Sequence, residues 1–172
     1  MLNYLTSNYP NKPISIDTRS AKVAQECLKS GATIINDVSG LDFDKGMTSI
    51  ISKQNCKVVI QHSSATPDIM QDNTNYTNLI DDIFMNLKAK TDFAIKNGIN
   101  KDNIIIDVGI GFGKTIEQNF ELLKRIKEFK SLGYPIMVGI SRKSLLQIPQ
   151  ENNLTKDIYA LALNSVLIDK QV

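Results

Sequence analysis

The chain has 172 residues, of which 42% are hydrophobic and 22% charged, and these proportions are ordinary for a globular protein with a buried core. The formal net charge is +2 with no dense basic run, which argues against a nucleic-acid-binding protein, and no apolar stretch is long enough to span a membrane. Only two cysteines, Cys27 and Cys56, are present, so we expect reduced thiols in a single cytoplasmic domain covering residues 1–172.

The first half of the chain alternates short apolar runs with amphipathic segments. In chain order, the pattern predicts a strand at 13–16, a helix at about 20–29, a strand at 33–35, a shorter helix at about 43–53, a strand at 57–60 and a helix at about 79–97. Thr18 is the predicted N-cap of the first helix, and Gly31 its stop. Lys88 and Lys90 are expected on a solvated face of the long helix.

The second half continues the alternation. It predicts a strand at 104–106, a helix at about 116–130, a strand at 135–139 and a last helix at about 156–168 that is apolar nearly all round. The expected inner stripe of the helix at 116–130 consists of Ile116, Phe120, Leu123, Ile126 and Phe129.

Five successive strand–helix units predict right-handed crossovers and a parallel sheet, hence an α/β fold. Such a sheet is either an open doubly wound sheet or part of a (β/α)₈ barrel of the TIM type, and periodicity does not separate the two.

Each predicted strand ends in polar residues, at the edge where parallel-strand proteins bind their ligands. These residues are Asp17 and Thr18, Asn36 and Asp37, Gln61 and His62, Asp107, and the run 141–144. Carboxylate and amide groups suit a flat heterocycle with adjacent donors and acceptors, whereas lysine and arginine suit an anion or a ring oxygen. The strand ends together therefore predict a small-molecule site.

Two other signals are weaker. The glycine run 109–114 lacks the spacing of a nucleotide P-loop, since the first glycine of that motif would fall on Val108. His62 is the only histidine and has no His or Cys cluster to bind a metal with, so we expect it to shape its loop.

Four motifs in succession resemble signatures of the dihydropteroate synthase family, and a fifth matches in part. The four are ISIDT at 14–18, IINDVSG at 34–40, DVGIGFGK at 107–114 and VGISRKS at 138–144, and the partial match is QHSSATPDIMQ at 61–71. The resemblance implies a partial TIM-type (β/α)₈ barrel of about five parallel units. It also implies a transferase that joins a dihydropterin pyrophosphate to para-aminobenzoate, releasing pyrophosphate, in folate biosynthesis.

The resemblance assigns roles residue by residue. Asp17, Asn36, Asp107 and Lys143 match residues that line the pterin pocket, and of these Asp107 and Lys143 are the candidate catalytic residues. Ser141 and Arg142 match residues near the aminobenzoate end. Such a site works by positioning and by assisting the leaving group, without a protein nucleophile.

The chain departs from the family pattern in three places. Val108 replaces a proline, and in the partial motif Ser63 and Ala65 replace a methionine and a glycine. The family's first two strands and its last strand have no counterpart, so we expect an incomplete barrel that is inactive alone. Mg²⁺ is the implied cofactor, but its usual ligand segment is among the missing parts, so no metal ligand is assigned. A homodimer is possible for the complete protein.

Two alternatives stay open. A methyltetrahydrofolate-type methyltransferase domain shares the barrel and the pterin slot, although the run 141–144 favours the synthase. A non-catalytic pterin-binding fragment is the second.

Overall fold

The computed structural model describes residues 1–63, 74–143 and 153–172. In chain order its elements are α1 (Leu2–Asn8), β1 (Ser15–Asp17), α2 (Ala21–Lys29), β2 (Ile34–Asp37), α3 (Met47–Gln54), β3 (Lys57–Gln61), α4 (Leu79–Lys96), the 3₁₀ helix η1 (Lys101–Asn103), β4 (Ile104–Asp107), α5 (Ile116–Arg125), the 3₁₀ helix η2 (Ile126–Leu132), β5 (Ile136–Met137) and α6 (Asn153–Asp169). The alternation of strands and helices expected from the sequence is confirmed.

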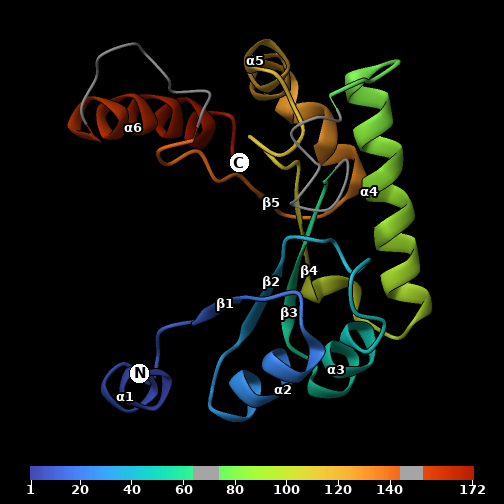
Figure 1. Ribbon diagram of the computed structural model, residues 1–172, viewed down its shortest axis with the longest axis vertical. Coiled ribbons are helices and arrows are strands. Elements are labelled where there is room, and N and C mark those ends of the chain that lie inside the picture. The colour runs from blue at the N-terminus through green and yellow to red at the C-terminus, as the bar shows by residue number, and fades with distance from the viewer. Residues whose placement is uncertain (64–73, 144–152) are drawn as a thin grey trace.

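The strands of the described residues form one parallel sheet in the order β1-β2-β3-β4-β5. Each strand lies beside its predecessor in the chain, whereas a doubly wound sheet reverses direction at a switch point. Helices α2 to α5 lie on one side of the sheet, while α1 and α6 extend from its two ends (Figure 1). The sheet is therefore part of a (β/α)₈ barrel wall.

The hydrophobic core lies between the sheet and helices α2 to α5. Alternate strand residues face these helices because successive side chains of a strand point to opposite faces. The fully buried side chains of this layer include Ile35, Ile60, Ile106, Ile83 and Leu87. Ile83 and Leu87 belong to α4, in which Ile80 and Ala94 are also buried and Phe84 is half-buried, at the spacing of one helix face.

The remaining strand residues point their side chains to the opposite face of the sheet. The strand register places Asn36 beside Val59 and Val59 beside Ile105, and it places Gln61 beside Asp107. This face corresponds to the inside of a barrel, and we call it the inner face. Its carboxyl-end residues include Asp17, Asn36, Gln61 and Asp107, which are among the polar residues that the sequence singled out.

One predicted helix cap and one predicted helix start are wrong. Ser20, not Thr18, caps α2: its side chain accepts from the backbone N–H of Val23, while the Thr18 hydroxyl accepts from the Ser20 N–H. Helix α3 begins at Met47 rather than near residue 43, because the Asp44 carboxylate holds a turn by accepting from the N–H groups of Ala21 and Gly46.

The expected stripe of α5 is also partly wrong. Ile116 and Phe120 are 42% and 47% exposed, and the buried positions are Asn119, Leu122 and Leu123. Asn119 is buried because its side chain accepts from the Gly111 N–H and donates to the carbonyls of Lys114 and Thr115. The buried face of α5 thus includes a hydrogen-bonded asparagine, which the spacing of the apolar residues does not reveal.

Lys90 is another correction. Lys88 is exposed as expected, but Lys90 is buried and reaches between elements. Its ammonium donates to the Ser39 carbonyl and pairs with the Asp42 carboxylate at 2.7 Å. Lys90 therefore ties α4 to the loop after β2.

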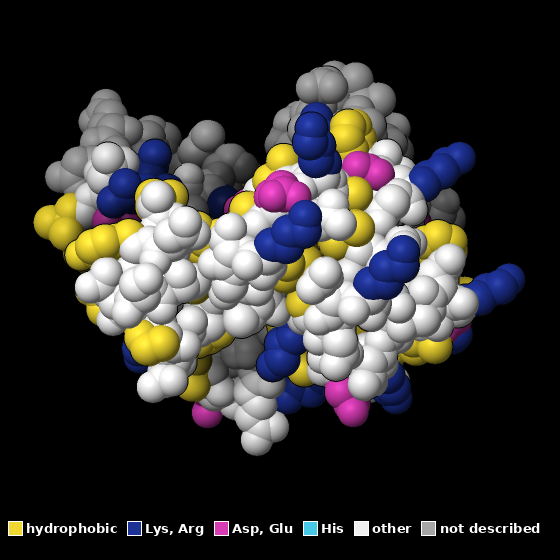
Figure 2. All heavy atoms as spheres, turned by 90° about the horizontal axis from the view of Figure 1, so that it is seen from below, with side chains coloured by type: hydrophobic (Ala, Val, Ile, Leu, Met, Phe, Trp, Pro, Cys, Tyr) yellow, Lys and Arg dark blue, Asp and Glu magenta, His cyan; other side chains and the backbone are white. Residues whose placement is uncertain are grey.

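Helix α6 buries only Ala160 and Leu167 among its residues. No helix in the described part of the chain is long and apolar enough to cross a membrane. Viewed from below, the surface carries separate Lys and Arg side chains without one continuous basic patch (Figure 2).

Candidate functional site

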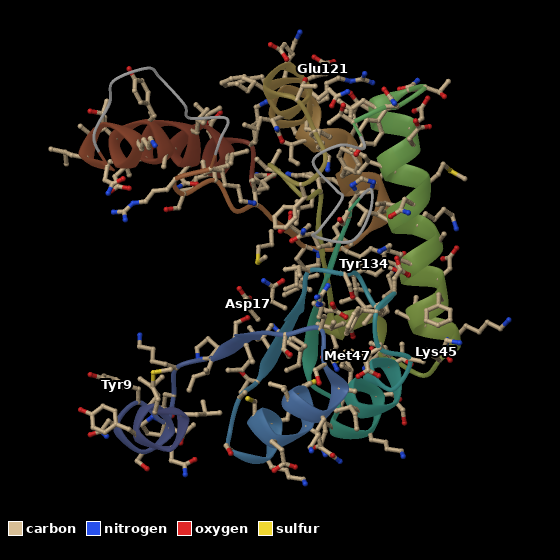
Figure 3. The ribbon with its side chains drawn as sticks, viewed as in Figure 1. Tyr9, Asp17, Lys45, Met47, Glu121 and Tyr134 are labelled. Carbon is tan, nitrogen blue, oxygen red and sulfur yellow. The ribbon has the colours of Figure 1, made fainter. Side chains whose placement is uncertain are left out.

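The ends of β1 and β2 bring Asp17 and Asn36 together on the inner face. The two residues are direct neighbours in the parallel register, and the Asn36 Nδ2 donates to Asp17 Oδ1 at 2.6 Å. Figure 3 shows Asp17 at the end of β1, on the side of the strand away from α2. The Asn36 Oδ1 is buried and has no hydrogen-bond partner among the described residues. It is a buried acceptor that the described residues leave unsatisfied.

Asp37, by contrast, faces the helices and has a structural role. Its carboxylate accepts from the backbone N–H and the hydroxyl of Ser39 and from the N–H of Leu41. These bonds shape the turn after β2. The adjacent residues Asn36 and Asp37 thus divide between the inner face and the loop.

Asp107 lies one layer further along the inner face, at the end of β4. It is 3% exposed, and its Oδ1 accepts from the Gly109 N–H at 2.7 Å. Burial raises the pKa of Asp107, while the Gly109 N–H and the charges of Lys143 and Lys114 oppose the shift. Asp107 is therefore a buried carboxyl whose ionised form depends on donors and cations around it.

The Lys114 side chain hydrogen-bonds to the glycine loop that follows Asp107. Its ammonium donates to the carbonyls of Gly109 and Phe112 at 3.0 and 2.8 Å and lies 3.1 Å from His62 Nδ1. Burial lowers the pKa of Lys114 to about 7, with Asp107 opposing and Lys143 adding to the shift. Burial, with the nearby lysines, lowers the pKa of His62 to about 2, so the imidazole is neutral.

Gly109 is required at its position. Its φ is +71°, and a Cβ there would lie 2.0 Å from the His62 carbonyl oxygen. The loop therefore packs directly on the end of β3, and only glycine permits this approach.

Lys143 lies over the same loop. Its Nζ donates to the Ile110 carbonyl and lies 4.5 Å from the centre of the Phe112 ring. Burial lowers the pKa of Lys143, and the carboxylate of Asp107 opposes that shift. The structure thus brings the predicted pair Asp107 and Lys143 into electrostatic contact.

Arg142 and Ser141 lie apart from this group. Both are exposed, and Arg142 forms a two-bond ion pair with Asp157 of α6 at 3.0 and 2.9 Å. Its φ of +51° shows that the chain has already left the strand conformation. In this structure the Arg142 guanidinium faces α6. Ser144 and Ala65, which belong to the quoted motifs, lie outside the described residues.

A groove of about 620 Å³ lies at the other end of the sheet. It is lined by residues 10–13 and by residues near the starts of β2 and β3, including Thr33, Cys56 and Lys57. No carboxylate lines it, and it is remote from the strand ends that carry Asp17 and Asp107. We therefore place the site at the carboxyl ends.

This arrangement of acid, amide, lysine and glycine loop agrees with a comparison of the whole chain with known families. Residues 1–168 match the family described as pterin binding enzyme. The chain belongs to this family.

A curated relative in the pterin binding enzyme family supports the assignment. The chain is 42% identical over 146 residues to a dihydropteroate synthase of Clostridium beijerinckii, which covers 83% of this chain and 52% of that protein. The chain spans about half the length of the curated relatives it matches.

Solved structures of similar enzymes share the fold. A dihydropteroate synthase of Clostridium difficile, solved with pteroic acid, has a TM-score of 0.88 and 39% identity, covering 98% of this chain and 62% of that one. One from Anaplasma phagocytophilum, with bound 6-hydroxymethylpterin-monophosphate, has a TM-score of 0.92 and 34% identity, covering 99% and 68%. The expected partial barrel is confirmed.

The expected magnesium ion finds no ligand set here. Among residues 1–63, 74–143 and 153–172, no three His, Cys, Asp or Glu side chains gather closely enough to hold a metal ion. The described residues therefore do not fit a metal centre, and we assign no step to one.

Sequence reasoning gave no role in the site to three residues of its buried group, namely Lys114, His62 and Gln61. All three are less than 7% exposed and lie beside Asp107 or its loop. Gln61 and His62 were visible as a polar strand end, but a polar strand end does not reveal which side chain faces the inner face. Lys114 gave no signal beyond its place after the last glycine.

Proposed function

We propose that the chain contributes the pterin-binding half of a dihydropteroate synthase. The reaction condenses 6-hydroxymethyl-7,8-dihydropterin pyrophosphate with para-aminobenzoate and releases pyrophosphate. The observation that carries the proposal is that buried Asp107 and Lys143 lie close enough to influence each other's charge, on the same face of a pterin-family barrel as the hydrogen-bonded Asp17–Asn36 pair.

The described side chains match the hydrogen-bonding groups of a pterin. The Asp107 carboxylate is suited to accept two parallel N–H bonds from the ring and its amino group. The Asn36 Oδ1 offers a further acceptor, and the Lys143 ammonium a donor to the ring oxygen. Burial of these groups strengthens such bonds because water does not compete.

The reaction needs no nucleophile from this chain. Its residues hold the ring so that the methylene carbon faces the incoming aromatic amine, and positioning of this kind supplies a large part of such a rate enhancement. Arg142 and Ser141 are proposed at the aminobenzoate end, which requires Arg142 to exchange Asp157 for the substrate.

The 172 residues alone are expected to bind pterin weakly and to show no turnover. β1 and β5 are edge strands of the described sheet, and each leaves backbone groups unpaired that a closed barrel would satisfy. A homodimer, a cytoplasmic location and dependence on Mg²⁺ stay predictions. No observation favours the methyltransferase reading over the synthase.

The test is pterin binding by calorimetry with 6-hydroxymethylpterin monophosphate. Asp107→Asn and Asn36→Ala should each lower affinity roughly tenfold or more, because each removes a buried partner worth about 1–3 kcal/mol. Glu121→Gln, a partly exposed position of α5, is the control and should bind normally. Unchanged affinity in both site variants would disprove the assignment. Dihydropteroate formation by residues 1–172 with Mg²⁺, at the rate of a complete synthase, would disprove the expected inactivity.

A further inference from the structure

Lys114 is a buried cation of the candidate site to which the proposed function gives no task. Its side chain follows the last glycine of the loop after β4 and is 6% exposed. Its ammonium donates to the carbonyls of Gly109 and Phe112 at 3.0 and 2.8 Å, and it lies 3.1 Å from the Nδ1 atom of His62. One ammonium therefore contacts both ends of the segment 109–112 and the residue that follows β3.

The loop 108–113 depends on side-chain contacts for its shape. Its three glycines all have positive φ, between +62° and +79°, and glycine has more backbone freedom than any other residue. The Asn119 side chain accepts from the Gly111 N–H at 2.7 Å, and the Tyr76 hydroxyl donates to the Gly113 carbonyl at 3.0 Å. A loop of this composition keeps one conformation only while such contacts hold it.

The two loop residues that Lys114 holds are those that contact the candidate catalytic side chains. The Gly109 N–H donates to Asp107 at 2.7 Å, while its carbonyl accepts from Lys114. The Phe112 ring lies 4.5 Å from the Nζ atom of Lys143, while its carbonyl accepts from Lys114. The Lys114 ammonium thus fixes the loop at the two residues through which it meets Asp107 and Lys143.

The charges of the site add to this geometry. The titratable groups around Lys114 are Asp107 at the end of β4, Lys143 after β5 and the neutral His62 after β3, on which Lys90 of α4 also acts. Burial raises the pKa of Asp107, and the Gly109 N–H and the charges of Lys143 and Lys114 oppose that shift. Loss of Lys114 would remove one of these cations and release the carbonyl of Gly109. Both changes favour the protonated acid, which accepts N–H bonds less well than the carboxylate does.

We propose that Lys114 is a positioning residue for pterin binding, which holds the glycine loop so that Asp107 and Lys143 face the same ligand. It acts through Gly109 and Phe112 rather than on the ligand. This inference rests on the proposed function and extends it to a residue outside the six assigned by resemblance. The contacts of Lys114 form without the ligand, so the loop is already in place when the pterin enters.

The experiment compares Lys114→Met with two control variants. Methionine keeps an unbranched side chain and removes the ammonium. Tyr76→Phe removes a different hydrogen bond to the same loop, the one to the Gly113 carbonyl, and Lys53→Met changes an exposed lysine of α3. Each protein is titrated with 6-hydroxymethylpterin monophosphate by calorimetry between about pH 4 and pH 8. Urea unfolding at the same pH values gives the folded fraction.

Lys114→Met is expected to bind the pterin about tenfold more weakly than the wild type at neutral pH, counted per folded molecule. On acidification its affinity should fall away at a higher pH than that of the wild type, because the Asp107 carboxylate has lost one of its cations. Tyr76→Phe and Lys53→Met should keep the affinity and the pH profile of the wild type. A lysine with a purely structural role would change the folded fraction and leave the pH profile of binding where it is.

The inference requires both effects. Wild-type affinity in Lys114→Met, an affinity loss without the shift in pH profile, or the same loss in Tyr76→Phe would overturn it and leave the proposed function intact. If Lys114→Met does not fold, Lys114→Gln, which keeps an N–H donor without the charge, takes its place with the same expected shift in pH profile. Failure of both the wild type and Lys53→Met to bind would overturn the proposed function and this inference with it.

Discussion

The buried ammonium of Lys114 leads to the sharpest prediction, which concerns the pH dependence of stability. Lys114 is 6% exposed, and burial lowers its pKa from 10.5 to about 7. Between these two pH values the unfolded chain binds a proton that the folded chain does not. The free energy of unfolding should therefore rise with pH through this window, and the contribution of Lys114 is lost as pH falls from 10.5 to 7.

The magnitude follows from the shift. Each pH unit within the window changes the unfolding free energy by about 1.4 kcal/mol, so the unfolding free energy should rise by roughly 3 kcal/mol between pH 7 and pH 9. Lys114→Met removes this dependence. It also leaves the carbonyls of Gly109 and Phe112 without their donor, at about 1–3 kcal/mol each. The variant should be less stable than the wild type at pH 9, and the deficit should shrink toward pH 7.

The assay is urea unfolding of both proteins at pH 7, 8 and 9, with the difference in unfolding free energy plotted against pH. Lys53→Met, at an exposed position of α3, is the control and should give a difference that does not change with pH. Parallel curves for the wild type and Lys114→Met would refute the argument, since they would mean that Lys114 is not a buried cation of lowered pKa.

Two further predictions concern the same loop. Lys143→Ala should weaken binding of 6-hydroxymethylpterin monophosphate more than binding of para-aminobenzoate, because Lys143 lies with Asp107 rather than with Arg142. Both affinities are measured by calorimetry. The reverse order would show that the two ends of the site are exchanged. Gly109→Ala should lower the unfolding free energy in urea by clearly more than the roughly 1–2 kcal/mol of a left-handed alanine, because its Cβ would meet the His62 carbonyl oxygen at 2.0 Å. Gly133→Ala is the control: it is also at positive φ, but its Cβ would lie 3.7 Å from the nearest atom, so it should cost only the conformational part. Equal losses would contradict the steric reason.

The sequence predicted the structure correctly where hydrophobic burial or strand pairing alone determines it. The buried stripe of α4 follows from apolar spacing because this helix packs on the core mainly through Ile, Leu and Ala side chains. The order of the strands follows from the regular alternation of strands and helices. Parallel pairing then makes the polar strand ends neighbours, which is why Asp17 and Asn36 meet as predicted.

Prediction failed where a polar side chain is buried for a specific partner. Lys90 reads as a solvated lysine, yet it is buried because the Ser39 carbonyl and the Asp42 carboxylate lie within its reach. Asn119 is buried on α5 for a comparable reason. The partners of Lys90 come from a distant part of the chain and those of Asn119 from the loop just before its helix, so the apolar periodicity of neither helix contains them.

Arg142 illustrates a different limit. Its predicted place at the aminobenzoate end came from the family resemblance, and only side-chain alternation along an extended strand could have given it a direction from the sequence itself. Strand β5 ends at Met137, and the backbone at Arg142 is left-handed. Alternation therefore gives no direction for this side chain, and the ion pair with Asp157 sets it instead.

The charges around Asp107 explain why the pterin-binding assignment is physically reasonable. Burial raises the pKa of Asp107 although two lysines lie near, and it lowers the pKa of both Lys114 and Lys143 although the carboxylate lies near. Desolvation thus outweighs mutual attraction for all three groups, so the protein alone does not fully stabilise their charges. A ring that donates N–H bonds to Asp107 and accepts one from Lys143 would stabilise the charged form of both groups. The same ring would satisfy the unpaired acceptor of Asn36, so the features that are unfavourable in the free chain become favourable contacts when ligand is bound.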